Sequence, residues 1–109
     1  MKVKRLYQQG DVLIELVSGS PPQGLERKTH SLVLAEGETT GHKHLLVAEE
    51  ISYGEVDGEI VFTIQGEAVI THEEHHSITL PPTKEGEVYR VRRVREYDHF
   101  AEEAKEVRD

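Results

Sequence analysis

The clearest fold signal in this chain is the stretch Tyr53-Gly-Glu-Val-Asp57-Gly58-Glu-Ile-Val-Phe-Thr-Ile64. Two segments with strand-forming residues, 53–56 and 60–64, flank an Asp-Gly pair. Glycine at the second position of a two-residue turn accepts the positive φ that a type I′ turn requires. The stretch therefore predicts a β-hairpin, and a hairpin predicts an antiparallel sheet around it.

Short apolar segments on both sides of this hairpin also have strand character, because they are rich in β-branched and aliphatic residues and end at glycine or proline. The tandem Pro81-Pro82 marks a loop or a sheet edge, since proline cannot donate to a central ladder. Regularly spaced short strands with such turns are typical of a small antiparallel barrel or sandwich. The predicted strands are residues 11–17, 30–35, 42–48, 68–72 and 88–97.

The last twelve residues are the one place where a helix is predicted. Asp98 can cap its N-terminus, and Phe100, Ala104 and Val107 follow at helical spacing. The sequence thus predicts an all-β domain with one short C-terminal helix. At 109 residues, without linkers or repeats, residues 1–109 are expected to form a single domain.

Composition limits the classes of function. There is no cysteine, which excludes disulfides and thiolate metal ligands, and the net charge of −8 disfavours nonspecific binding to nucleic acid or to an anionic membrane. The N-terminal segment lacks the apolar core of a signal peptide, so a cytoplasmic location is expected. Few aromatic residues and many short strands leave sheet edges and an aliphatic face to cover, which predicts a homodimer.

Histidines provide the main functional signal. Five of the seven lie in residues 37–54 and 71–76, and imidazole is the commonest metal ligand in proteins. Strand periodicity puts His42 and His44 on one face, whereas His72 continues the apolar face of the segment before it. We therefore expect these three to bind one divalent metal, whether zinc, iron, manganese or nickel. His75 or His76 are alternatives to His72.

The segment His72-Glu-Glu-His75-His76 also matches the zincin pattern His-Glu-x-x-His. That chemistry needs a helix, which places both histidines on one face and the glutamate near the metal-bound water. Strand-forming residues precede and follow the segment, so we interpret the match as coincidental.

Around the first histidine pair, Gly37, His42, His44, Glu49 and Gly54 resemble the first sequence motif of the cupins. The resemblance implies a cupin-like barrel and a metal site to which Glu49 contributes a carboxylate. The second cupin motif has no clean counterpart here. A histidine of the second cluster would therefore take the place of that motif's ligand.

Four short blocks that together span most of the chain resemble a family of short, uncharacterised prokaryotic and phage proteins. The resemblance implies that the blocks belong to one unit, and it implies no activity. The blocks are Gln9-Gly-Asp-Val-Leu-Ile14, Gly41-His-Lys-His44, Thr71-His-Glu-Glu-His75 and Tyr89-Arg-Val-Arg-Arg-Val-Arg-Glu-Tyr-Asp98.

The arginines of the last predicted strand support a second interpretation. Guanidinium groups bind phosphate and carboxylate bidentately, so Arg90 and Arg92 beside His72 are candidate catalytic residues of a metal-free phosphodiesterase or nuclease. The same arginines fit an exposed sheet face that is paired with glutamates.

Three functions follow from these patterns. The first is a metal-dependent enzyme acting on a small-molecule or anionic substrate, because a metal with open positions can activate a bound oxygen. The second is the metal-free hydrolase. The third is a non-catalytic binding or assembly module whose histidines make an interface sensitive to pH. The sequence does not decide among them.

Overall fold

The computed structural model of this chain describes residues 2–19, 24–36 and 42–93, and all the regular elements in these ranges are strands. The protein is therefore all-β, as predicted. The predicted C-terminal helix lies outside the described residues, as does Gly37 of the cupin-like motif. The strands are β1 (Lys2–Gln9), β2 (Val12–Ser18), β3 (Arg27–Glu36), β4 (Lys43–Val56), β5 (Glu59–Thr71), β6 (Ile78–Leu80) and β7 (Glu87–Arg93).

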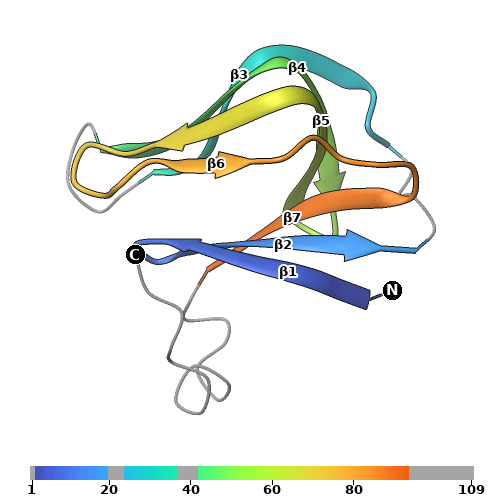
Figure 1. Cartoon of the computed structure of the whole chain (residues 1–109), viewed down its shortest axis with the longest axis horizontal. Coiled ribbons are helices and arrows are strands. Elements are labelled where there is room, and N and C mark those ends of the chain that lie inside the picture. The colour runs from blue at the N-terminus through green and yellow to red at the C-terminus, as the bar shows by residue number, and fades with distance from the viewer. Residues whose placement is uncertain (1, 20–23, 37–41, 94–109) are drawn as a thin grey trace.

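The strands form one antiparallel sheet in the order β1-β2-β7-β5-β4-β3, and the short β6 pairs with β5. Figure 1 shows the sheet folded over, with β1, β2 and β7 in a lower layer and the upper parts of β3, β4 and β5 arching across it. Within the described residues β1 and β3 do not pair with each other. The sheet is therefore open within these residues, and the finer prediction of a cupin-like barrel or sandwich is not confirmed.

The predicted hairpin is confirmed. Asp57 and Gly58 have φ values of 53° and 80°, the two positive values of a type I′ turn. The hairpin is much longer than predicted, because residues 43–48 and 53–56 belong to one strand and residues 60–64 and 68–71 to another. A bulge between Ala48 and Glu50 opposite Gly66, whose φ is +74°, bends the hairpin without interrupting it.

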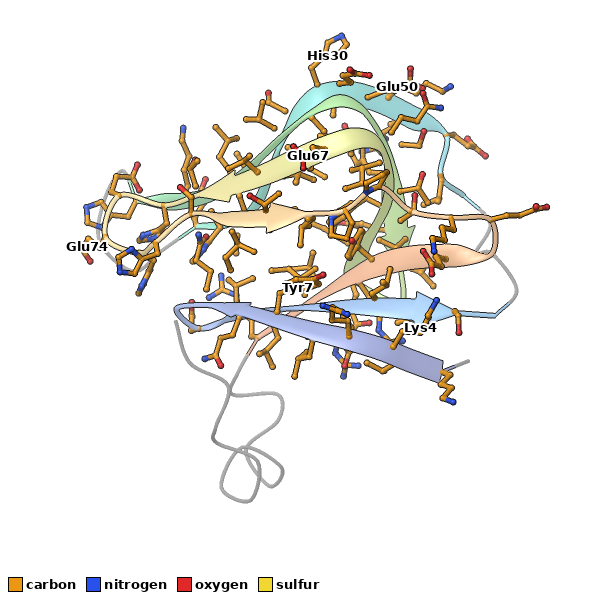
Figure 2. All side chains as sticks on the ribbon, viewed as in Figure 1. Lys4, Tyr7, His30, Glu50, Glu67 and Glu74 are labelled. Carbon is orange, nitrogen blue, oxygen red and sulfur yellow. The ribbon has the colours of Figure 1, made fainter. Side chains whose placement is uncertain are left out.

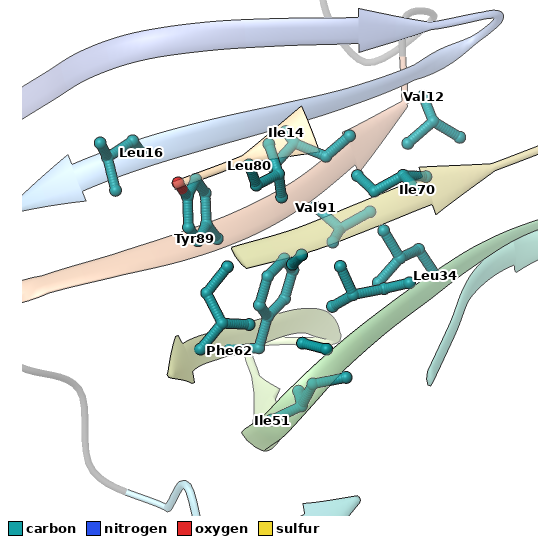
Figure 3. Close-up of a cluster of buried hydrophobic side chains, with 14 residues drawn as sticks. Val12, Ile14, Leu16, Leu34, Ile51, Phe62, Ile70, Leu80, Tyr89 and Val91 are labelled. Carbon is teal, nitrogen blue, oxygen red and sulfur yellow. The ribbon is translucent and has the colours of Figure 1, made fainter. Parts of the chain in front are cut away.

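Because of this bend, the β4–β5 hairpin contributes strand segments to both layers of the sheet. The first half of β5 pairs with β7 through Val61 and Phe62, and the second half pairs with β6 from Ala68 to Ile70. The apolar faces of the two layers therefore meet. Figure 3 shows the resulting core, in which Phe62 and Tyr89 stack with ring centroids 5.2 Å apart. The buried Tyr89 hydroxyl donates to the Pro81 carbonyl at 2.7 Å, which satisfies its polar end.

Strand β1 was missed by the sequence analysis. Its first five residues are exposed, and three of them are Lys2, Lys4 and Arg5. Charged residues on an edge strand discourage pairing with other chains, and they also remove the apolar alternation that identifies a strand in a sequence. Only at its end does β1 become buried, where Gln9 is fully covered.

Three segments far apart in sequence meet at this end of the molecule. They are the turn between β1 and β2, the start of β4, and the loop between β5 and β6 (Figure 1). Hydrogen bonds from Gln9 to Ile70 and His76 join the first to the third. The predicted histidines lie on these segments. No helix of the described residues is long and apolar enough to cross a membrane.

Candidate metal centre

The strand register brings the two histidine clusters together. Leu45 pairs with Thr71 in the β4–β5 ladder, so the next position along the ladder places His44 beside His72. The His72 ring centroid lies 5.6 Å from that of His42, 4.3 Å from that of His44 and 4.6 Å from that of His75. His72 is therefore the central ring of a four-histidine cluster, which we call the histidine cluster.

A group of potential metal ligands lies at the open side of this cluster. His42, His72 and Glu73 each offer one ligand atom, and these three atoms lie within 4.8 Å of one another. Both histidines are half-buried and Glu73 is exposed, so the group is held by the fold but open to solvent. Two imidazoles and one carboxylate are the donors of many catalytic zinc sites and of non-haem iron(II) sites.

Glu73 is anchored to the neighbouring strand. The backbone N–H of Lys43 donates to its Oε1 at 3.1 Å, which ties the loop after β5 to the start of β4. This hydrogen bond, together with one from its own backbone, lowers the pKa of Glu73. The side chain is therefore a carboxylate at neutral pH, which is the form that binds a metal.

Glu74 contacts both candidate ligand histidines. The His42 Nδ1 lies 3.7 Å from Glu74 Oε1, so a proton on Nδ1 would leave the lone pair of Nε2 for a metal. The Glu74 backbone N–H donates to His72 Nδ1 at 3.0 Å, which places the ring proton of neutral His72 on Nε2. Metal binding at His72 must therefore replace this hydrogen bond or displace that proton. Figure 2 shows Glu74 at this end of the molecule.

His44 lies behind His72 and is 2% exposed. Its Nδ1 is 2.8 Å from Gln9 Oε1, and its Nε2 is 3.8 Å from Asp11 Oδ1. Burial, together with the nearby His72, lowers the pKa of His44 to about 4. His44 is thus neutral at pH 7. It is next to the three-ligand group but is not one of its members.

The predicted carboxylate, Glu49, does not lie at the histidine cluster. It lies at the β4 bulge, where its carboxyl group faces Gly66, and its carbonyl lies 2.6 Å from the Nδ1 of His30. In Figure 2 His30 and the adjacent Glu50 lie far along the sheet from Glu74. The structure instead places Glu73, a residue of the rejected zincin pattern, beside His42 and His72. Rejection of that pattern holds, because residues 72–77 contain no helix.

The remaining histidines of the second cluster have other surroundings. His75 packs on the β1–β2 turn, where a Cβ added to Gly10 would lie 2.6 Å from its Nε2. His76 is exposed, and its carbonyl accepts a hydrogen bond from Gln9. Of the three alternatives that the sequence left open, His72 is the one that the structure places beside both His42 and His44.

The two candidate arginines of β7, Arg90 and Arg92, do not join the histidine cluster. Arg90 donates to Glu15 through Nε and Nη2, at 2.9 and 2.7 Å, and Arg92 pairs with Glu59 at 2.8 Å. Because side chains alternate along a strand, both lie on the face of β7 opposite Tyr89 in the core. This arrangement matches the interpretation of a charged sheet face and separates the proposed phosphate clamp from His72.

Fold and site together define an all-β protein with a histidine and carboxylate cluster at one end of an open sheet. The chain belongs to the family described as domain of unknown function (DUF8820), which matches residues 8–94. This match includes every residue of the cluster described above. Searches of the curated proteins and of the solved structures found no match. Functional inference therefore rests on the geometry of the site.

Proposed function

We propose that this protein binds one divalent transition metal through His42, His72 and Glu73. The observation that supports the proposal is the convergence of three ligand atoms within 4.8 Å from two separate segments of the chain. Two neutral imidazoles and one carboxylate suit zinc or iron(II) better than magnesium or calcium, which prefer oxygen ligands. This proposal keeps His42 and His72 of the predicted ligands, leaves out His44, and replaces Glu49 by Glu73.

We further propose that the bound metal acts on a small molecule. Three protein ligands leave coordination positions open, and a metal with open positions can activate water or polarise an oxygen of a substrate. A shallow groove lined by Lys43, Leu45 and Thr71 continues from His72 and Glu73. Its ammonium and hydroxyl groups suit a substrate with an anionic or polar group, and the leucine suits a small apolar part.

Metal titration of untagged, metal-stripped protein tests the first proposal. Zinc, iron(II), manganese and nickel are each titrated by calorimetry, and one ion per chain is expected for at least one of them. The variants His42→Ala, His72→Ala and Glu73→Gln should each weaken that binding by at least about tenfold, since each removes a ligand. His30→Ala and Glu49→Gln are the matched controls, because they change the same residue types away from the cluster.

The outcome separates the present assignment from the cupin-like one. Loss of binding in Glu49→Gln with retention in Glu73→Gln would move the site to the cupin-like ligand set. Absence of stoichiometric binding for all four metals would reject the metal function. If a metal binds, metal-dependent activity is assayed with small anionic esters and amides, and Lys43→Gln is expected to raise KM more than it lowers kcat.

A further inference from the structure

The side chain of Gln9 is fully buried beneath the histidine cluster, and its amide group makes three hydrogen bonds. Its Nε2 donates to the carbonyl of Ile70 at 3.1 Å and to that of His76 at 2.8 Å. Its Oε1 lies 2.8 Å from the Nδ1 of His44. A buried glutamine satisfied in this way is held in one orientation.

This orientation determines which nitrogen of His44 carries the proton. Both partners of the Gln9 amino group are carbonyl oxygens, which only accept, so the amino group must face them. The amide oxygen must then face His44 and accept from Nδ1–H. The neutral ring is thereby fixed as the Nδ1–H tautomer, with the lone pair on Nε2. The His44 ring, held in this way, packs on the ring of His72 with centroids 4.3 Å apart and so limits where His72 can lie.

The same amide also ties together the two ends of the ligand-bearing segment. Ile70 is the last buried residue of β5, and His76 precedes β6. Residues 71–75 between them carry His72 and Glu73. Because one rigid group holds both flanking carbonyls, the loop can present its two ligands in only a narrow range of positions.

The neighbouring residue supports the same loop. Gly10, in the β1–β2 turn, has a φ of +60° and no side chain, and a Cβ there would overlap the His75 ring. Gln9 thus holds both ends of the loop, and Gly10 leaves room for the ring of its last residue, His75. The family match begins at residue 8, so it includes this turn.

We infer that Gln9 is a positioning residue of the metal site, acting through the His44 tautomer and through the ends of the 71–75 loop. The inference rests on the proposed function, since the site that Gln9 positions is the one formed by His42, His72 and Glu73. Gln9 itself contributes no ligand atom to that group.

The test compares Gln9→Met with Gln8→Met. Methionine keeps the length of the side chain and removes its hydrogen bonds. Gln8 is a suitable control because its amide bonds only the Gly10 carbonyl in its own turn, at 2.8 Å. Zinc affinity is measured by competition with a chromophoric chelator, and the His44 tautomer is measured from imidazole ¹⁵N and ¹³C shifts in the metal-free protein.

Gln9→Met should weaken zinc binding by about 10–100-fold, the usual effect of removing such a support. It should also reduce the Nδ1–H fraction of His44, because the acceptor of that proton is lost. Gln8→Met should change neither. If Gln9→Met does not fold, Gln9→Glu replaces it. A carboxylate still accepts from His44 but cannot donate to the two carbonyls, so the tautomer should persist while zinc affinity falls.

Two results would overturn the inference. The first is an unchanged zinc affinity or an unchanged His44 tautomer in Gln9→Met. The proposed function would then still stand, because the wild-type protein would still bind zinc. Absence of zinc binding by the wild-type protein would instead reject the proposed function, and the inference with it.

Discussion

Replacement of Gly54 by alanine should destabilise the fold, because Gly54 lies where two backbone segments touch. A Cβ on this buried residue of β4 would lie 2.1 Å from the carbonyl oxygen of Gly24 and 3.1 Å from its carbon. Ordinary contact begins at 3.4 Å, so the backbone segments would have to separate by about 1.3 Å. Overpacking of this kind costs about 1–3 kcal/mol. The free energy of unfolding should fall by that amount.

The matched control is Gly58→Ala. Nothing lies within 4 Å of a Cβ at Gly58, but its φ of +80° is unfavourable for alanine, at a cost of about 1–2 kcal/mol. Gly54 is not among the glycines with positive φ, so its loss is purely steric. Urea unfolding followed by far-UV circular dichroism measures both variants. An unfolding free energy of Gly54→Ala equal to that of the wild type would refute the close approach of Gly24.

Three further predictions concern charge, metal and assembly. The Lys4 ammonium lowers the pKa of the buried Glu87 carboxyl group. The ionised group should therefore stabilise the fold at pH values above its ordinary pKa of 4.5, and this stability should be lost as the pH falls through the lowered pKa. In urea unfolding, Glu87→Gln should reduce this loss of stability at acidic pH. Zinc at a hundredfold excess over its Kd should raise the unfolding free energy by about 2.7 kcal/mol in denaturant titrations, and Glu73→Gln should lose most of this gain. Val47 and Val69 are paired across β4 and β5, and their side chains are 45% and 36% exposed. Such an exposed apolar pair favours association, so sedimentation should show a dimer, and Val47→Lys should weaken it. A monomer at all concentrations would contradict this prediction.

The parts of the fold that could be predicted are those with local causes. The Asp57-Gly58 turn was identifiable because its backbone conformation depends on two residues. The length of the β4–β5 hairpin was not, because polar residues at the Glu49 bulge and the adjacent Gln65-Gly66 pair looked like a break between strands. The bend that they produce depends on the packing of both layers, which no single segment contains.

The candidate site, like the fold, could be predicted only in part. The period of two along strands predicted that His42, His44 and His72 would meet, and their rings do lie side by side. Glu73 was missed because it was set aside with the zincin pattern, which needs a helix. Strand β5 ends at Thr71, and it is the loop after it, not a helix, that brings Glu73 beside His72. Gln9 contacts Ile70 across 61 positions, and nothing in the sequence near either residue indicates this contact.

The surroundings of the histidine cluster favour metal binding over metal-free acid–base catalysis. Metal-free hydrolysis by His72 would need arginines beside it to hold the phosphate. The arginines that would hold a phosphate are paired with Glu15 and Glu59 on another face. The ligand atoms of His42, His72 and Glu73, by contrast, lie within 4.8 Å of one another, which is the arrangement that a single metal cation requires.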